Sequence, residues 1–150
     1  MKKLLIIALL IFAFTSCSTK KEAFPLPHDL FEEISEKTKL AEMYDMTDEM
    51  LEDVVGITPD IYSDAVYMTS SNGMSSEEII IVKGNTEDDA DVIEEKLGKR
   101  LNYIKKSAEN YLIEELPIIE KAVIRRDGLT VSLIVSPKVD KIIEIYKNYN

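Results

Sequence analysis

Apolar residues occur along this chain in two patterns, and each predicts a different kind of element. Apolar positions three or four residues apart indicate one face of a helix, whereas short unbroken apolar runs indicate buried strands. The first pattern predicts helices over residues 28–43, 47–55, 86–108 and 137–146. The second predicts strands over residues 65–69, 79–82, 122–126 and 129–135, with a short helical or irregular link at 111–121.

Capping and turn residues mark the boundaries of these elements. Thr86 has the position of a helix N-cap, and Ser136-Pro137 begins the last helix. Asp127-Gly128 is a strong hairpin signal between the last two strands. Two strands followed by a helix occur twice. We therefore predict an α+β fold with a four-stranded, mainly antiparallel sheet and helices packed on one face.

The first residues form a third pattern, that of a secretory signal. Lys2 and Lys3 precede an apolar run over residues 4–14, and Ser16 and Cys17 follow it. A Cys directly after small residues resembles a bacterial lipoprotein signal, in which that Cys is lipidated and becomes the mature N-terminus. A plain secretory signal would instead export a lone thiol. A helix of this run would span about 16 Å, against a hydrocarbon core of about 30 Å, which disfavours an uncleaved anchor.

The lipoprotein interpretation divides the chain into three parts. Residues 1–16 are the signal peptide, residues 17–27 are the lipidated Cys17 and a tether, and residues 28–150 are a single α+β domain. We predict cleavage between Ser16 and Cys17 and acylation of Cys17, with palmitate among the acyl chains. The tether reaches at most about 35 Å, so the domain is expected close to the extracytoplasmic face of the cell membrane.

Charge and residue inventory exclude several functions. The chain has a net charge of −10, and loss of Lys2 and Lys3 with the signal would leave −12. So acidic a chain is repelled by phosphate backbones, and we expect no nucleic-acid partner. One His and one Cys, the latter acylated, exclude an intrachain disulfide, His/Cys metal sites and Cys–His nucleophilic pairs.

Three kinds of residue remain as candidates for chemistry, namely a histidine, acidic residues and tyrosines, and each kind has a structural interpretation as well. His28 is either a catalytic base or a residue at the start of a helix. Of two acidic groups, the first is either a set of Ca²⁺ ligands or the acidic start of a helix, where it complements the helix dipole, and the second is interpreted as a solvated helix face. These groups are Glu87, Asp88, Asp89 and Asp91, and Asp45, Asp48, Glu49, Glu52 and Asp53. The tyrosines either line a sugar or peptide groove or pack in the core; they are Tyr44, Tyr62, Tyr67, Tyr103 and Tyr111.

The second half of the chain resembles a known family. The segment around Glu78 reads EEIIIVKGNTEDDADVIEEKLGKRL, and Glu115 stands ahead of Ala122-Val123, followed by Gly128 and Val135-Ser136. These features resemble Firmicute lipoproteins that carry domain of unknown function 4358, over roughly residues 30–147. The resemblance implies the lipoprotein layout and the fold, and it implies no activity.

We expect a membrane-anchored extracytoplasmic lipoprotein that acts as a binding or interaction module. Its expected partners are the membrane, through lipid on Cys17, and an envelope protein or polymer. The alternative is an extracytoplasmic hydrolase that acts on cell-envelope material through paired carboxylates, although no pair is fixed at the separation this chemistry needs. We assign no catalytic residue, cofactor or metal from the sequence.

Overall fold

The structure is a computed structural model that describes residues 23–149. The predicted signal peptide, Cys17 and the tether up to residue 22 therefore lie outside the described residues. Within residues 23–149, no helix combines the length and the hydrophobicity that crossing a bilayer requires.

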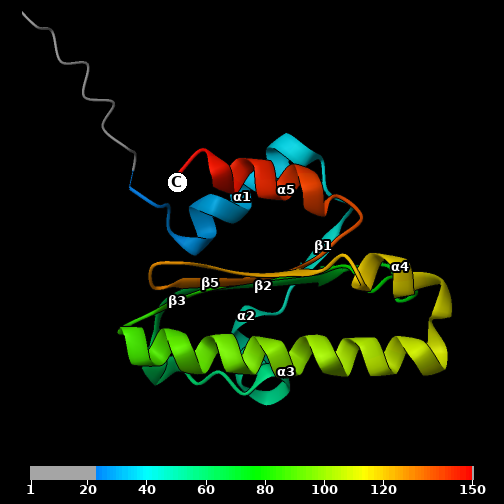
Figure 1. Cartoon of the computed structure of the whole chain (residues 1–150), viewed down its shortest axis with the longest axis horizontal. Helices are drawn as coiled ribbons and strands as arrows, with labels where there is room; N and C mark the ends of the chain where they lie inside the picture. The colour runs from blue at the N-terminus through cyan, green and yellow to red at the C-terminus, as the bar shows by residue number, and fades with distance from the viewer. Residues whose placement is uncertain (1–22, 150) are drawn as a thin grey trace, which may run out of the picture.

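A five-stranded antiparallel sheet forms the centre, in the order β1-β2-β3-β5-β4 (Figure 1). The α+β class and the antiparallel pairing are confirmed, but the sheet has five strands and not four. The strands are β1 (Met43–Asp45), β2 (Tyr62–Ser70), β3 (Glu78–Gly84), β4 (Val123–Asp127) and β5 (Thr130–Val135).

Helices and helical turns connect the strands. The α-helices are α1 (Pro27–Thr38), α2 (Thr47–Met50), α3 (Glu87–Tyr111), α4 (Leu116–Ile119) and α5 (Val139–Lys147). A π-helical turn, η1 (Leu51–Val55), continues α2, and the 3₁₀ turns are η2 (Pro59–Ile61) and η3 (Ile113–Glu115).

Helices cover both faces of the sheet, which corrects the prediction of helices on one face. In Figure 1, α1 and α5 lie on one side and α3 lies on the other. Successive side chains of a strand point to opposite faces, and residues 79–82 are apolar and fully buried at every position. Ile79 and Ile81 pack with α1 and α5, whereas Ile80 and Val82 pack with α3. Each face therefore needs its own hydrophobic cover.

The strand that the sequence did not predict is β1. It is possible because the first helix ends earlier than predicted. α1 stops at Thr38, and Lys39 closes it in the left-handed conformation with a φ of 52°. Tyr44 continues the helical spacing of apolar residues, but it lies in β1 opposite Thr69 of β2. So short an edge strand has no period of its own, which is why the sequence pattern assigned part of it to a helix.

The long helix and the last hairpin follow the sequence closely. Thr86 caps α3 as predicted, because its Oγ1 accepts a hydrogen bond from the Asp89 amide at 3.2 Å. The hairpin turn is shifted by one residue, since Asp127 pairs with Thr130. Gly128 therefore takes the first central position with a φ of 61°, as a two-residue II′ turn requires.

Candidate functional site

A polar recess lies between the C-terminal half of α3 and the β2–β3 connection. Its cavity volume is about 170 Å³. Four half-buried residues with hydroxyl groups line it: Thr69 at the end of β2, Ser75 and Ser76 in the connection, and Ser107 on α3. The hydroxyls of Thr69 and Ser107 make no hydrogen bond with the described residues, so they are available to a bound molecule.

Glu78 and Arg100 line this recess, and together with the buried Tyr67 behind them they form an ion-paired cluster. Arg100 Nε donates to Glu78 Oε1 at 2.9 Å, and its Nη2 donates to Glu78 Oε2 at 2.6 Å. Nη2 also donates to the Tyr67 hydroxyl at 3.1 Å, and that hydroxyl donates to Glu78 Oε2 at 3.2 Å. The side chains of Arg100 and Glu78 are only 14% and 5% exposed. β2, β3 and α3 thus each contribute one member of a fixed group.

Burial and mutual contact determine the protonation of this cluster. Burial raises the pKa of the Tyr67 phenol well above its ordinary value, and the charge of Glu78 raises it further. Burial acts to lower the pKa of Arg100, but the hydrogen bonds and charge of Glu78 outweigh burial and raise that pKa. Tyr67 is therefore neutral and Arg100 is charged at every physiological pH.

Arg100 keeps one guanidinium nitrogen without a hydrogen-bond partner among the described residues. Nη1 takes part in none of the hydrogen bonds among the described residues, although Arg100 lines the cavity. The guanidinium carbon lies 5.4 Å from the ring centre of Tyr103, a cation–π contact. Tyr103 is itself 63% exposed and lines the same cavity. The wall thus offers a fixed donor beside an open aromatic ring.

A second cavity of about 380 Å³ adjoins the recess at Leu112, which lines both. Its lining includes three large apolar side chains that are mostly exposed, namely Met74, Tyr111 and Ile113. Glu115 connects the two cavities, because its Oε2 accepts hydrogen bonds from Ser76 N at 2.8 Å and from Ser76 Oγ at 2.9 Å. This clamp holds the β2–β3 connection against η3.

The arrangement of the recess suits binding better than covalent catalysis. A serine nucleophile needs an adjacent general base, usually a His that is oriented by a third group. The recess lining contains no His or Cys. Ser76 contacts a carboxylate, but that carboxylate also accepts from the Ser76 backbone amide, which identifies it as a structural clamp.

His28 lies elsewhere and has a structural contact. It belongs to the first turn of α1, and its Nδ1 lies 2.7 Å from Asp64 Oδ1 on β2. The His28 side chain is 64% exposed. Its position matches the prediction of a residue at the start of a helix, and its contact holds α1 to the sheet.

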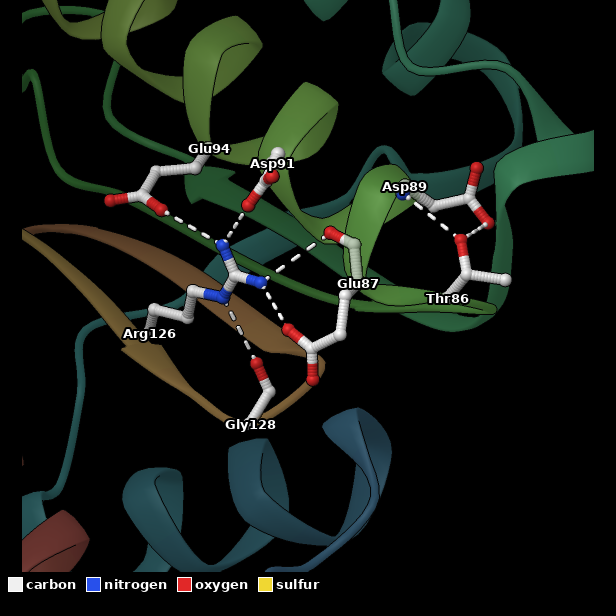
Figure 2. Close-up of polar contacts among 7 residues, drawn as sticks. All are labelled: Thr86, Glu87, Asp89, Asp91, Glu94, Arg126 and Gly128. Carbon is white, nitrogen blue, oxygen red and sulfur yellow. Dashed lines mark hydrogen bonds and ion pairs between the residues drawn. The ribbon is translucent and has the colours of Figure 1, made fainter.

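The acidic residues in the first turns of α3 form ion pairs with Arg126 of β4 (Figure 2). Arg126 Nη2 contacts Glu87 Oε2 at 2.5 Å, Nη1 contacts Asp91, and Nη1 lies 3.5 Å from Glu94 Oε2. The hydrogen bond that Arg126 donates to Asp91 is the main cause of a raised Arg126 pKa. Asp89 instead bonds to Thr86. Among the described side chains, no cluster of His, Cys, Asp or Glu is arranged to hold a metal ion.

The tyrosines that the sequence suggested as groove residues differ in burial and in position. Tyr67 is buried in the ion-paired cluster, and Tyr44 is 58% exposed on β1. Tyr103 and Tyr111 are exposed and line the two cavities. In the second acidic group, the side chains of Asp48 and Glu49 lie outside the described part of the structure.

Sequence reasoning did not identify Arg100 or Glu115 as site residues. In the sequence, Arg100 lies near Lys99 and Lys105 on a predicted helix that also carries acidic residues, a pattern typical of a solvated helix face. Its partner Glu78 is 22 residues away, and Glu115 is 39 residues from Ser76. A local signal was present in Glu78, an acidic residue at the start of an apolar strand, because a charged side chain that is buried there needs a partner of opposite charge.

A comparison with protein families places most of this chain in a known family. The family model described as a domain of unknown function, DUF4358, matches residues 35–136. This range lies inside the range over which the sequence resembles that family. Comparisons with curated proteins and with solved structures find no match.

Proposed function

Because this chain belongs to the DUF4358 family, which is defined by a domain of unknown function, we propose its function from its own residues. The protein is a membrane-anchored extracytoplasmic lipoprotein, and its domain binds a ligand or partner at the two adjoining cavities. The observation that carries the binding role is the placement of available polar groups and exposed aromatic rings around those cavities.

The anchor follows from the N-terminal pattern. The apolar run over residues 4–14 ends at Ser16 and Cys17, and the described domain begins with α1 at Pro27. One acyl chain binds a bilayer only marginally, whereas two give stable anchoring. The acidic domain adds no electrostatic attraction to anionic lipids, so the lipid on Cys17 must supply the membrane affinity.

Metabolic labelling tests the anchor. We expect a fatty-acid probe to label the unmodified protein and to leave the Cys17→Ala variant unlabelled, because the acyl acceptor is lost. Ser18→Ala is the matched control and should be labelled like the unmodified protein. An unlabelled wild-type protein would show that Cys17 carries no lipid.

Site-specific photo-cross-linking on intact cells tests the binding role. A photoreactive amino acid at position 111 should give a discrete cross-linked species, because Tyr111 is 82% exposed beside the second cavity. The same amino acid at position 92 is the control, since Val92 is exposed near the other end of α3. Equal cross-linking from both positions, or none from either, would contradict a binding site at the cavities.

The hydrolase alternative gains no support from the recess. Glu78 is ion-paired with Arg100, and Glu115 accepts two hydrogen bonds from Ser76. Glycoside hydrolysis needs one carboxylic acid and one free carboxylate placed across a scissile bond. The two carboxylates that we describe at the recess are both engaged in holding the wall, so we favour binding.

A further inference from the structure

We propose that the two adjoining cavities bind a neutral oligosaccharide, with one sugar ring in the hydroxyl-lined recess and the next beside Tyr111. This inference rests on the proposed binding function and names the chemical class of its ligand. The ligand must match the polar groups, the charge and the aromatic surfaces of the site, and each of these restricts the choice.

The polar groups of the recess match a ligand with several hydroxyls. Arg100 Nη1 offers N–H donors, while Thr69 and Ser107 offer hydroxyls that both donate and accept. Ser75 Oγ accepts from the Glu77 amide and keeps its own proton to donate. The recess lining thus offers both donors and acceptors around a small volume, which suits a sugar ring, whose hydroxyls each donate and accept.

The charge around the cavities excludes an anionic ligand. Arg100 is neutralised by Glu78 through two hydrogen bonds, and Glu114 and Glu115 line the second cavity. The charged residues that line the two cavities therefore carry a net negative charge, in a chain whose net charge is already −10. A carboxylate or phosphate ligand would be repelled, whereas a neutral ligand avoids this cost.

The backbone around the recess disfavours an extended peptide. Peptides that bind sheets add a strand at an exposed edge. Thr69 lies on β2, which pairs with β1 and β3, and Glu78 lies on β3, which pairs with β2 and β5. The strands at the recess are therefore already paired on both sides. The ligand must bind through side chains, as a sugar does.

The aromatic rings fit a ligand of more than one ring. Tyr103 lines the first cavity and Tyr111 the second, and both are mostly exposed. They are eight residues apart on α3, a rise of about 12 Å. The C–H faces of sugar rings pack on aromatic surfaces, and an exposed tyrosine ring offers such a surface with a polar tip. Two such surfaces in adjoining cavities indicate an oligosaccharide.

The experiment uses the full-length protein in a phosphocholine detergent, which has no sugar headgroup. The probes are cellotriose, maltotriose, tri-N-acetylchitotriose and the peptide Ala-Ala-Ala, each measured by calorimetry and saturation-transfer NMR. We expect at least one trisaccharide to bind in the millimolar range or tighter, and the peptide not to bind. Tyr103→Ala and Ser107→Tyr should each weaken binding about tenfold, since one removes the aromatic surface and the other fills the recess.

Val92→Ala is the matched control, because Val92 is exposed on the same helix away from both cavities. It should bind the trisaccharide like the unmodified protein, and circular dichroism should show all three variants folded. Absence of trisaccharide binding, binding of the peptide alone, or binding that both recess variants leave unchanged would overturn the proposal. If cross-linking at position 111 succeeds and trisaccharide binding fails, only the ligand class is wrong; failure of the cross-linking contradicts the binding function itself.

Discussion

Arg100 holds three neighbours in place at once. Its guanidinium donates to Glu78 and Tyr67 and lies over the ring of Tyr103. A buried ion pair adds little net stability, because desolvation offsets most of the attraction. Loss of one partner is costly for the same reason, since the remaining charge stays buried and unpaired. The position of the recess wall therefore depends on this one side chain.

Arg100→Met is expected to lower the free energy of unfolding by about 3–5 kcal/mol, because it leaves the buried carboxylate of Glu78 without its cationic partner. The double variant Arg100→Met/Glu78→Gln should recover part of that loss, since the buried charge is removed as well. Urea titrations followed by circular dichroism measure both values. Lys99→Met is the control and should change little, because Lys99 pairs with Glu95 on the exposed surface. A double variant less stable than Arg100→Met would contradict this account.

Two buried phenols set the behaviour of the protein at alkaline pH. Burial raises the pKa of both Tyr67 and Tyr146 above the ordinary value near 10. Their neutral forms are therefore favoured in the folded state, and this stability is fully present below pH 10. As pH rises above 10, the unfolded chain loses these protons while the folded chain keeps them. The free energy of unfolding then falls by up to about 1.4 kcal/mol per pH unit for each tyrosine.

Tyr146→Phe isolates one of these two groups. Tyr146 donates a hydrogen bond to Ser132 at 2.8 Å, so the variant should lose about 1 kcal/mol at neutral pH. Above pH 10 its stability should fall about half as steeply as that of the unmodified protein. Val92→Ala serves as the control and should keep the full slope, because it changes an exposed side chain and removes no ionisable group. Identical slopes for Tyr146→Phe and the unmodified protein would exclude Tyr146 as a source of the pH dependence.

Gly128 in a turn and Gly98 in a helix differ in what a side chain would do at their positions. Gly128 begins the β4–β5 turn with a φ of 61°, where a side chain is strained, whereas Gly98 lies inside α3 with no atom near the place of a Cβ. Gly128→Ala should therefore lower the free energy of unfolding by about 1 kcal/mol. Gly98→Ala should raise it by about 0.5–1 kcal/mol, because alanine loses less backbone entropy in a helix. Urea titration of both variants measures these changes. Changes of the same sign in the free energy of unfolding would contradict the prediction.

Elements with their own local signals could be predicted from the sequence. α3 has a capping residue and a long apolar stripe, and both are observed at Thr86 and at the buried residues of the helix. The last hairpin was placed within one residue, because Gly128 is required by its turn. β1 was missed, since a short edge strand depends on its partner β2 and not on its own residues.

The cover of the sheet and the recess could not be predicted in the same way. Full burial of residues 79–82 already required apolar cover on both faces, but which helix covers which face depends on long-range packing. The recess depends on pairs such as Arg100 with Glu78, far apart in the chain. Of the residues at the cavities and in the ion-paired cluster, Tyr67, Tyr103 and Tyr111 were named beforehand as possible members of a groove. Their spacing alone could not separate them from core residues.

The hydrophobic clusters on the two faces of the sheet share one set of strands, so we expect the two clusters to unfold together. Leu97 packs on one face of the sheet and Ile142 on the other, and both are fully buried. Alternate residues of β3 belong to the two clusters. Neither cluster can therefore form without the strand that the other cluster stabilises. A division into separately folding units would have to cut through β3 and β5 themselves.

Leu97→Ala and Ile142→Ala test this coupling. Each should lower the free energy of unfolding by about 2–5 kcal/mol, because each leaves a cavity in a packed cluster. Each should keep a single transition with an unchanged urea dependence, followed in parallel by circular dichroism and by tyrosine fluorescence. Val92→Ala, at an exposed position of α3, is the control and should unfold like the unmodified protein. If either core variant unfolds in two steps, or the two probes separate, the clusters are independent and the prediction of one domain over residues 28–150 is wrong.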